Sequence, residues 1–298
     1  MFRSGERFLL GSGCVRSLLA LAAVSSLAVA CSRGARPEVT GEGCEAAPHA
    51  VASSEAAAIE PGPSAAQAAL AAPVSAPGVA VVELFTSEGC SSCPPADRVL
   101  GELVHAAARD HQAVYALSFH VDYWNYLGWR DRFSNSEYSE RQRRYHAINP
   151  GSGTYTPQIV VNGEAETVGS NASRVRSLVA ASLGEPAHTT IELGTTRVGA
   201  SIRVTYRVSG ASSGRVLNLA LLEPHAESAV NSGENAGERL AHENVVRDFS
   251  SRSLASSTSG EWLIAPRSEF DIDGATVVAF AEGEGQRAIS GANAISLR

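Results

Sequence analysis

The feature that most constrains the fold of this chain is a pair of cysteines, Cys90 and Cys93, placed between an apolar run and an amphipathic segment. The run over residues 79–86 is almost continuously apolar, which is typical of a strand buried on both faces. Residues 96–108 place their apolar side chains on one helical face. The sequence therefore predicts a strand, a short loop that carries the two cysteines, and a helix.

Strand and helix patterns continue to alternate after this unit. The sequence predicts buried strands over 113–119 and 158–163, and helices over 137–147 and 172–183. Strands that alternate with helices are typical of an α/β layer fold with parallel strand pairing. We therefore expect a first domain of this class over residues 78–186.

The hydrophobic period changes to two after Pro186. Residues 202–208 alternate between apolar and polar side chains, which indicates a strand with one face in water. No long helical pattern follows, so residues 187–298 predict a second, all-β domain that resembles a small sandwich. Further strands are expected over 216–222, 243–249, 261–265 and 275–281.

The N-terminal residues predict a targeting segment, residues 1–31, rather than part of the fold. Three arginines accompany an apolar stretch over 17–30 that is too short and too rich in small residues to span a membrane. Its end, residues 28–30, reads Ala-Val-Ala and fits an ordinary signal-peptidase site. Together with Cys31 it also resembles a bacterial lipobox, in which Cys31 would carry a lipid. Both interpretations predict export, and they leave open whether a lipid on Cys31 anchors the protein to a membrane.

Residues 32–77 are rich in Ala, Pro, Ser, Glu and Gly and contain almost no large apolar side chain, which predicts a flexible tether. Of the five cysteines, Cys14 lies in the targeting segment and Cys44 in the tether. Only Cys90 and Cys93 fall in a folded region. An oxidising compartment outside the cytoplasm allows a disulfide between them.

A Cys-x-x-Cys motif that opens a helix is suited to thiol–disulfide exchange. The positive end of the helix dipole favours a thiolate, so we expect Cys90 to be an exposed nucleophile and Cys93 a partly buried resolving cysteine. The prolines that follow predict that the regular helix begins near Pro95, after a tight turn. Glu88 would oppose the thiolate if its side chain pointed at the cysteines.

Two other roles for the cysteines stay open. They can form a disulfide that only staples a loop, in a module that binds a partner without catalysis. They can also hold a soft metal such as copper, with His120 as a third ligand, whereas the irregular histidine spacing disfavours zinc. Glu234, Asn235 and His242 in the second domain are expected to brace a loop or a domain contact.

Net charge and the motifs that are missing exclude several classes of function. The formal charge of −7 and a pI near 5.7 argue against a nucleic-acid partner. The sequence contains no P-loop or dinucleotide fingerprint, so nucleotide-dependent activities have no support. We expect no cofactor.

Residues 83–97 resemble the signature of a secreted bacterial family of unknown function (domain of unknown function 1223), which is placed in the thioredoxin-like superfamily. The resemblance covers residues 78–298 and implies a thioredoxin-like fold for the first domain. The other matching blocks are residues 120–124 with 128–129, 155–158, 233–237 and 244–247.

The resemblance also implies roles for individual residues. It implies a cis bond between Thr156 and Pro157 in a loop beside the cysteines, where residue 156 would pair with an extended substrate. It further implies that Glu83 helps proton transfer to the resolving cysteine. We therefore expect an exported thiol–disulfide oxidoreductase that acts on protein thiols and disulfides in the periplasm or cell envelope, with membrane anchoring if Cys31 is lipidated.

Overall fold

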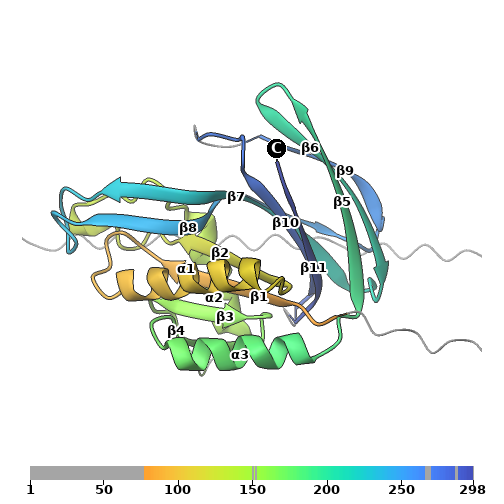
Figure 1. Ribbon diagram of the computed structural model, residues 1–298, viewed down its shortest axis with the longest axis horizontal. Helices are drawn as coiled ribbons and strands as arrows, with labels where there is room; N and C mark the ends of the chain where they lie inside the picture. Colours follow the sequence, from red (N-terminus) through yellow and green to blue (C-terminus); the bar gives the residue numbers. More distant parts are fainter. Residues whose placement is uncertain (1–76, 150, 152, 266–269, 286–287, 298) are drawn as a thin grey trace, which may run out of the picture. The chain divides into compact units, whose positions relative to one another are not determined.

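The computed structural model describes residues 77–149, 151, 153–265, 270–285 and 288–297 (Figure 1). The predicted targeting segment, 1–31, and all of the predicted tether except its last residue lie outside these described residues. None of the helices in the described part is long and apolar enough to cross a membrane.

An eight-stranded mixed sheet is the framework, in the order β11-β10-β7-β8-β2-β1-β3-β4. Its two halves come from the two regions that the sequence predicts as domains, and they join where β2 pairs in parallel with β8 through Ser118 and Val245. The sheet therefore continues across the predicted boundary near residue 186. The first region supplies β1 (Ala80–Thr86), β2 (Val114–His120), β3 (Gln158–Val161) and β4 (Ala165–Val168), and the second supplies β7 (Arg215–Ala229), β8 (Arg239–Ser253), β10 (Thr276–Gly283) and β11 (Ile289–Ser296).

Strand β1 is buried along its whole length because helices cover both faces of the sheet around it. Side chains at alternate positions, such as Val82 and Leu84, pack with α1 (Pro94–Arg109) and α3 (Ala172–Gly184). Those between them, such as Val81 and Phe85, pack on the other side with α2 (Ser136–Ile148). The expectation of an α/β fold with three helices is thus confirmed.

The prediction of parallel pairing is correct for β1 with β2 and wrong for β3, which runs antiparallel to β1. Thr86 pairs with His120 and Phe85 with Gln158, so β2 ends and β3 begins at the same end of the sheet. The connection that contains α2 therefore leaves and re-enters the sheet at one end, and β3 must run in the opposite direction. That end is also where the cysteine loop follows β1.

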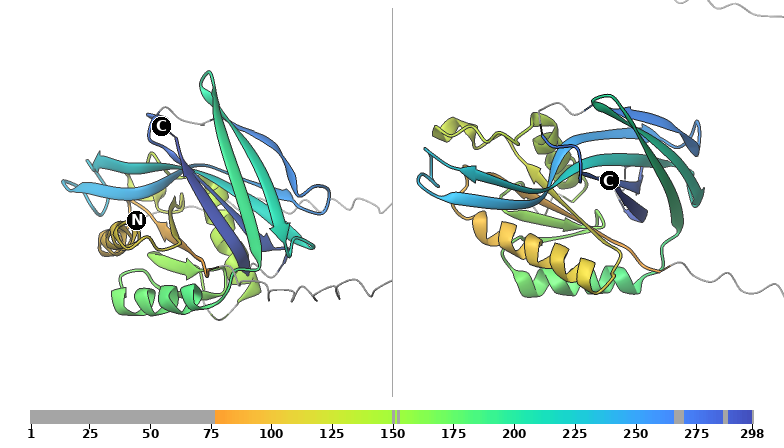
Figure 2. Two further views of the ribbon diagram at one scale, coloured as in Figure 1. Left: turned by 45° about the vertical axis from the view of Figure 1, so that its right-hand side comes forward. Right: turned by 45° about the horizontal axis from the view of Figure 1, so that its top comes forward.

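A separate three-stranded antiparallel sheet packs against the second half of the large one. It has the order β5-β6-β9 and faces β10 and β7 across an apolar core (Figures 1 and 2). The predicted alternation over 202–208 is confirmed, since the apolar residues are buried and the polar ones exposed. The three strands are β5 (Thr189–Val198), β6 (Ser201–Gly210) and β9 (Ser259–Ile264).

The β7–β8 hairpin is longer than the sequence predicts. Pairing continues from Val216 with Ser253 out to Ala229 with Arg239, although the outer half of the hairpin is mostly polar and contains Pro224. The extension carries the connecting residues, Val230–Glu238, to the cysteine loop. These nine residues are called the cover loop below.

Candidate functional site

Cys90 and Cys93 form a disulfide at the start of α1, with 5.4 Å between their Cα atoms. Cys93 is the N-cap residue of α1, and Pro94 and Pro95 occupy its first positions, where the missing N–H has no cost. The backbone N–H of Cys93 donates to the carbonyl oxygen of Cys90 over 3.1 Å. The cysteines therefore lie in a tight turn that leads into the helix, as expected from the two prolines.

The prediction that Cys90 is exposed is wrong, because both cysteines are 0% exposed. The cover loop lies against their turn. Asn235 donates from Nδ2 to the carbonyl oxygens of Glu88 (2.8 Å) and Cys90 (3.1 Å), and Glu234 accepts from the backbone N–H of Ser91 over 2.9 Å. The expected role of Asn235 and Glu234 as braces of a loop is therefore confirmed, and the loop they brace is the cysteine turn itself.

The Thr156–Pro157 peptide bond is cis, and Thr156 lies beside the disulfide. Its hydroxyl donates to Sγ of Cys90 over 3.3 Å and accepts from the indole N–H of Trp124 over 2.8 Å. The structure thus brings together Cys90, Cys93 and the Thr156–Pro157 loop. The cysteine turn, the segment with Trp124 and the Thr156–Pro157 loop are distant in the sequence, and they meet at one end of the sheet.

Glu83 is not brought to the cysteines. It projects from β1 to the face that α2 covers, whereas α1 covers the opposite face. There Arg141 donates to both carboxylate oxygens of Glu83, and the Tyr145 hydroxyl donates to one of them. Arg141 also donates to Glu282 from β10 over 2.9 Å. Glu83 therefore belongs to a buried ion-pair network that joins α2 to the sheet.

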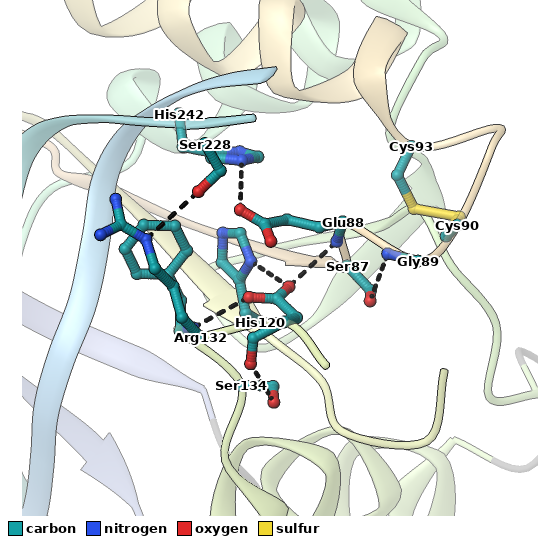
Figure 3. A network of polar contacts seen from close by, with 12 residues as sticks. Ser87, Glu88, Gly89, Cys90, Cys93, His120, Arg132, Ser134, Ser228 and His242 are labelled. Carbon is teal, nitrogen blue, oxygen red and sulfur yellow. Dashed lines mark hydrogen bonds and ion pairs between the residues drawn. A yellow bond between two sulfur atoms is a disulfide. The ribbon is translucent and has the colours of Figure 1, made fainter. Parts of the chain in front are cut away.

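A second group of buried ionisable side chains lies on the α1 face, near the disulfide. It comprises Glu88, Asp97, His120, Asp131 and His242, and is called the acid–histidine cluster below. Figure 3 shows the Glu88 carboxylate directed toward His242 and away from the disulfide. Oε1 of Glu88 lies 3.5 Å from Nε2 of His242, and Oδ1 of Asp97 lies 3.8 Å from its Nδ1.

His120 belongs to this cluster and not to the cysteines. Its Nδ1 lies 2.7 Å from Oδ2 of Asp131, an oxygen that also accepts from the backbone N–H of Glu88 over 2.9 Å. Burial alone would raise the pKa of Asp131, but His120 and the backbone donors hold it below its ordinary value. The proposed metal set with the cysteines is not assembled, and within the described ranges no three His, Cys, Asp or Glu side chains are arranged to hold a metal ion.

The charges in the cluster follow from its geometry. Burial alone would lower the pKa of His242, but Asp97 and Glu88 on its two sides raise it to about 10. Burial alone would raise the pKa of Glu88, but the interaction with His242 lowers it, and the net shift is downward. A His242 imidazolium therefore lies between two carboxylates at neutral pH. The sequence shows no local sign of this arrangement, because β8 supplies His242 from more than 130 residues beyond the end of α1.

Comparisons with known proteins place this fold. A family model described as a protein of unknown function (DUF1223) matches residues 81–282. The crystal structure of protein AGR_C_4864 from Agrobacterium tumefaciens is 25% identical, with a TM-score of 0.55, and the match covers 73% of this chain and 94% of that one.

HBP35 of Porphyromonas gingivalis is 15% identical, also with a TM-score of 0.55, and the match covers 75% of this chain and 76% of that one. No curated protein matches. The fold is therefore thioredoxin-like, with a mixed sheet and three helices, and carries a separate small antiparallel sheet.

Proposed function

The chain belongs to the DUF1223 family of proteins of unknown function, and from its own site we propose that it is an exported thiol–disulfide oxidoreductase. The observation that carries the proposal is the Cys90–Cys93 disulfide at the start of α1, with the Thr156 hydroxyl 3.3 Å from Sγ of Cys90. A disulfide at a helix N-terminus suits exchange because the helix dipole stabilises the thiolate that leaves.

The reaction transfers two electrons between this disulfide and a partner dithiol. A partner thiolate attacks one sulfur, the Cys90–Cys93 bond breaks, and a mixed disulfide forms. The second partner thiolate then attacks the mixed disulfide, so that the partner leaves oxidised and both cysteines become thiols. The reverse sequence reduces a partner disulfide. Both sulfurs are buried and the cover loop is hydrogen-bonded to their turn, so we expect this loop to move before a partner sulfur reaches them.

The proposal also names the compartment in which the protein acts and the class of its partners. The N-terminal sequence supports export to the periplasm or cell envelope, with a lipid on Cys31 as one form of attachment. The partners are then proteins of that compartment that contain thiols or disulfides. The Ser91 and Ser92 side chains are exposed beside the buried sulfurs, and they mark where such a partner would approach.

A variant that stops the reaction halfway tests this function. In the Cys93→Ser chain, Cys90 is expected to keep partners as mixed disulfides, because the resolving thiol is missing. Non-reducing gels of envelope extracts should show at least about tenfold more reducible adduct than wild type. Cys44→Ser is the matched control and should behave as wild type. Equal adduct levels in the Cys93→Ser and Cys90→Ser chains would contradict the proposal.

A second candidate function rests on the burial of both sulfurs. The disulfide then only holds the turn beneath the cover loop, and the protein binds a partner without catalysis. In that case the double Cys90→Ser, Cys93→Ser variant should lose stability and keep partner binding. The reduction potential of the disulfide separates the two functions, and it is considered at the end of the Discussion.

A further inference from the structure

Trp124, in the loop that follows β2, contacts both the cysteine loop and Thr156. Its indole N–H donates to Oγ1 of Thr156 over 2.8 Å. A Cβ atom on Gly89 would lie 3.1 Å from Cβ of Trp124 and 3.3 Å from its carbonyl oxygen, so the two loops approach closely because residue 89 has no side chain. Trp124 also belongs to the block of residues 120–124 that resembles the family signature, and the exchange steps described above give this block no part.

The hydrogen-bond directions at Thr156 follow from the chemistry of its two neighbours. An indole nitrogen can only donate, so Oγ1 of Thr156 accepts from Trp124. A disulfide sulfur has no hydrogen and can only accept, so the Thr156 hydroxyl donates to Sγ of Cys90 over 3.3 Å. Oγ of Ser92 also lies 3.3 Å from that sulfur and donates to it for the same reason. Two hydroxyl groups therefore donate to Cys90, and Trp124 sets the direction of one of them.

Helix α2 holds Trp124 and Thr156 in place relative to each other. Nε2 of Gln142 donates to the carbonyl oxygen of Tyr155, next to Thr156, over 2.7 Å. Oε1 of the same side chain accepts from the hydroxyl of Tyr123, next to Trp124, over 3.1 Å. Gln142 is buried, so water competes little for these bonds. One side chain thus fixes both segments that meet in the Trp124–Thr156 hydrogen bond.

The charged groups around the cysteines have other partners. Among the described residues, neither sulfur takes part in a hydrogen bond or ion pair with a charged side chain. Figure 3 shows the Glu88 carboxylate directed away from the disulfide. The titratable groups of the surrounding elements and their partners are Glu88 and Asp97 with His242, Asp122 with Ser139, Tyr123 with Gln142, Tyr155 with Glu166, and Glu234 with the backbone of Ser91.

The two hydroxyls stabilise a thiolate at Cys90 more than they stabilise the disulfide. A disulfide sulfur is a weak, neutral acceptor, whereas a thiolate is charged, and hydrogen bonds to charged groups are about twice as strong. Sγ of Cys93 has no such hydroxyl contact among the described residues. The site therefore distinguishes the two sulfurs and favours negative charge on Cys90.

We propose that Trp124 is a positioning residue for Cys90, which acts by holding the Thr156 hydroxyl toward the sulfur that becomes a thiolate. This inference rests on the proposed function and makes one of its steps specific. When the second thiolate of a partner attacks the mixed disulfide, it bonds to the partner sulfur, the bond to Cys90 breaks, and the electron pair leaves on Sγ of Cys90. The Thr156 hydroxyl donates to that charged sulfur, which later takes a proton from water.

The pH dependence of Cys90 alkylation tests the proposal. The full-length chain, with Cys14, Cys31 and Cys44 replaced by serine, is reduced and treated with iodoacetamide between about pH 5 and 10, and mass spectrometry follows the Cys90 peptide. The thiolate is the form that reacts, so the midpoint of the rate profile reports its formation. Each profile is scaled to its own maximum, so that a change in the opening of the cover loop does not move the midpoint.

In Trp124→Phe the midpoint is expected to rise by about one pH unit, which is about tenfold less thiolate at a pH below both midpoints. Thr156→Val removes the hydroxyl and should raise the midpoint at least as far, whereas Thr156→Ser keeps the hydroxyl and should match the parent chain. Adding Trp124→Phe to Thr156→Val should move the midpoint no further, because Trp124 acts through that hydroxyl. Trp262→Phe is the matched control, since this ring lies in β9 and contacts Arg252, with Cζ 4.2 Å from the ring centroid.

The outcomes separate the inference from the function on which it rests. Equal midpoints in Trp124→Phe and the parent overturn the inference alone, and so does an equal rise with and without the Thr156 hydroxyl. A parent chain that never exchanges its disulfide with glutathione overturns the proposed function, and the step assigned here with it.

If Trp124→Phe does not fold, the indole N–H resonance of Trp124 in the parent chain decides. It should shift when the disulfide is reduced at a pH above the midpoint, because the thiolate polarises the Thr156 hydroxyl and, through it, the indole N–H. Thr156→Val should lose this shift. An indole resonance that is the same in the oxidised and reduced parent overturns the inference.

Discussion

Replacing Asn235 with alanine is expected to make dithiothreitol reduce the Cys90–Cys93 disulfide about tenfold faster. Asn235 is 7% exposed and donates to two carbonyl oxygens, those of Glu88 and Cys90. Each such bond contributes about 0.5–1.5 kcal/mol, so losing both favours opening of the cover loop by about five- to 150-fold. The reductant reaches the sulfurs only in the open form, so the rate of reduction follows the population of that form.

Thiol alkylation and mass spectrometry at fixed dithiothreitol concentration, under conditions where the chain is folded, measure this rate. Asn293→Ala is the matched control. Asn293 also donates to a carbonyl oxygen, that of Ile191 over 2.7 Å, and this hydrogen bond does not involve the cysteine turn or the cover loop. Equal rates in Asn235→Ala and wild type would show that the cover loop does not limit access.

The largest loss of stability is expected from Arg141→Met. Arg141 is 1% exposed and pairs with Glu83 from β1 and Glu282 from β10, both also buried. Methionine fills much of the same space but removes the buried cation that Glu83 and Glu282 share. Removing one partner of a buried ion pair costs about 3–5 kcal/mol, so the free energy of unfolding should fall by about that amount.

Urea denaturation of wild type, Arg141→Met and a control variant, Arg143→Met, checks this prediction. Arg143→Met is the matched control on the same helix, since Arg143 is 53% exposed and pairs with Glu140 at the surface. Exposed ion pairs contribute little, so its effect should stay within about 0.5 kcal/mol. Similar losses in the two variants would mean that the buried network contributes no more than a surface pair.

The elements around the cysteines can be predicted because their signals are local. The apolar run that becomes β1, the Cys-x-x-Cys loop and the amphipathic α1 follow each other directly in the sequence. The alternation in β6 is equally local, and it correctly predicts the buried face of the small sheet. Patterns of this kind depend on the period of a helix or strand and need no knowledge of the rest of the fold.

The contact between the cover loop and the cysteine turn has no such local signal in the sequence. Asn235 and Cys90 are 145 residues apart, and their contact depends on how far the β7–β8 hairpin extends. The outer half of that hairpin is mostly polar, so hydrophobic periodicity does not mark it as strand. The burial of Cys90 therefore depends on a pairing between distant segments, and the sequence alone predicts an exposed nucleophile.

Glu83 carries a signal in the sequence that indicates a buried ion pair rather than proton transfer to a cysteine. A carboxylate within a buried strand needs a buried cation, and the period of two places Glu83 on the opposite face from Val82 and Leu84. That face is the one that α2 covers, and Arg141 is its buried cation. The side of the sheet that α2 covers is set by the tertiary fold, which the local pattern does not contain.

The reduction potential of the Cys90–Cys93 disulfide tests the central claim most directly. The full chain is equilibrated in buffers of graded redox potential, and thiol alkylation with mass spectrometry gives the fraction oxidised. The proposed oxidoreductase predicts a reversible potential between about −270 and −120 mV, the range of known exchange catalysts. A potential below about −300 mV would contradict it and identify the bond as a structural disulfide beneath the cover loop.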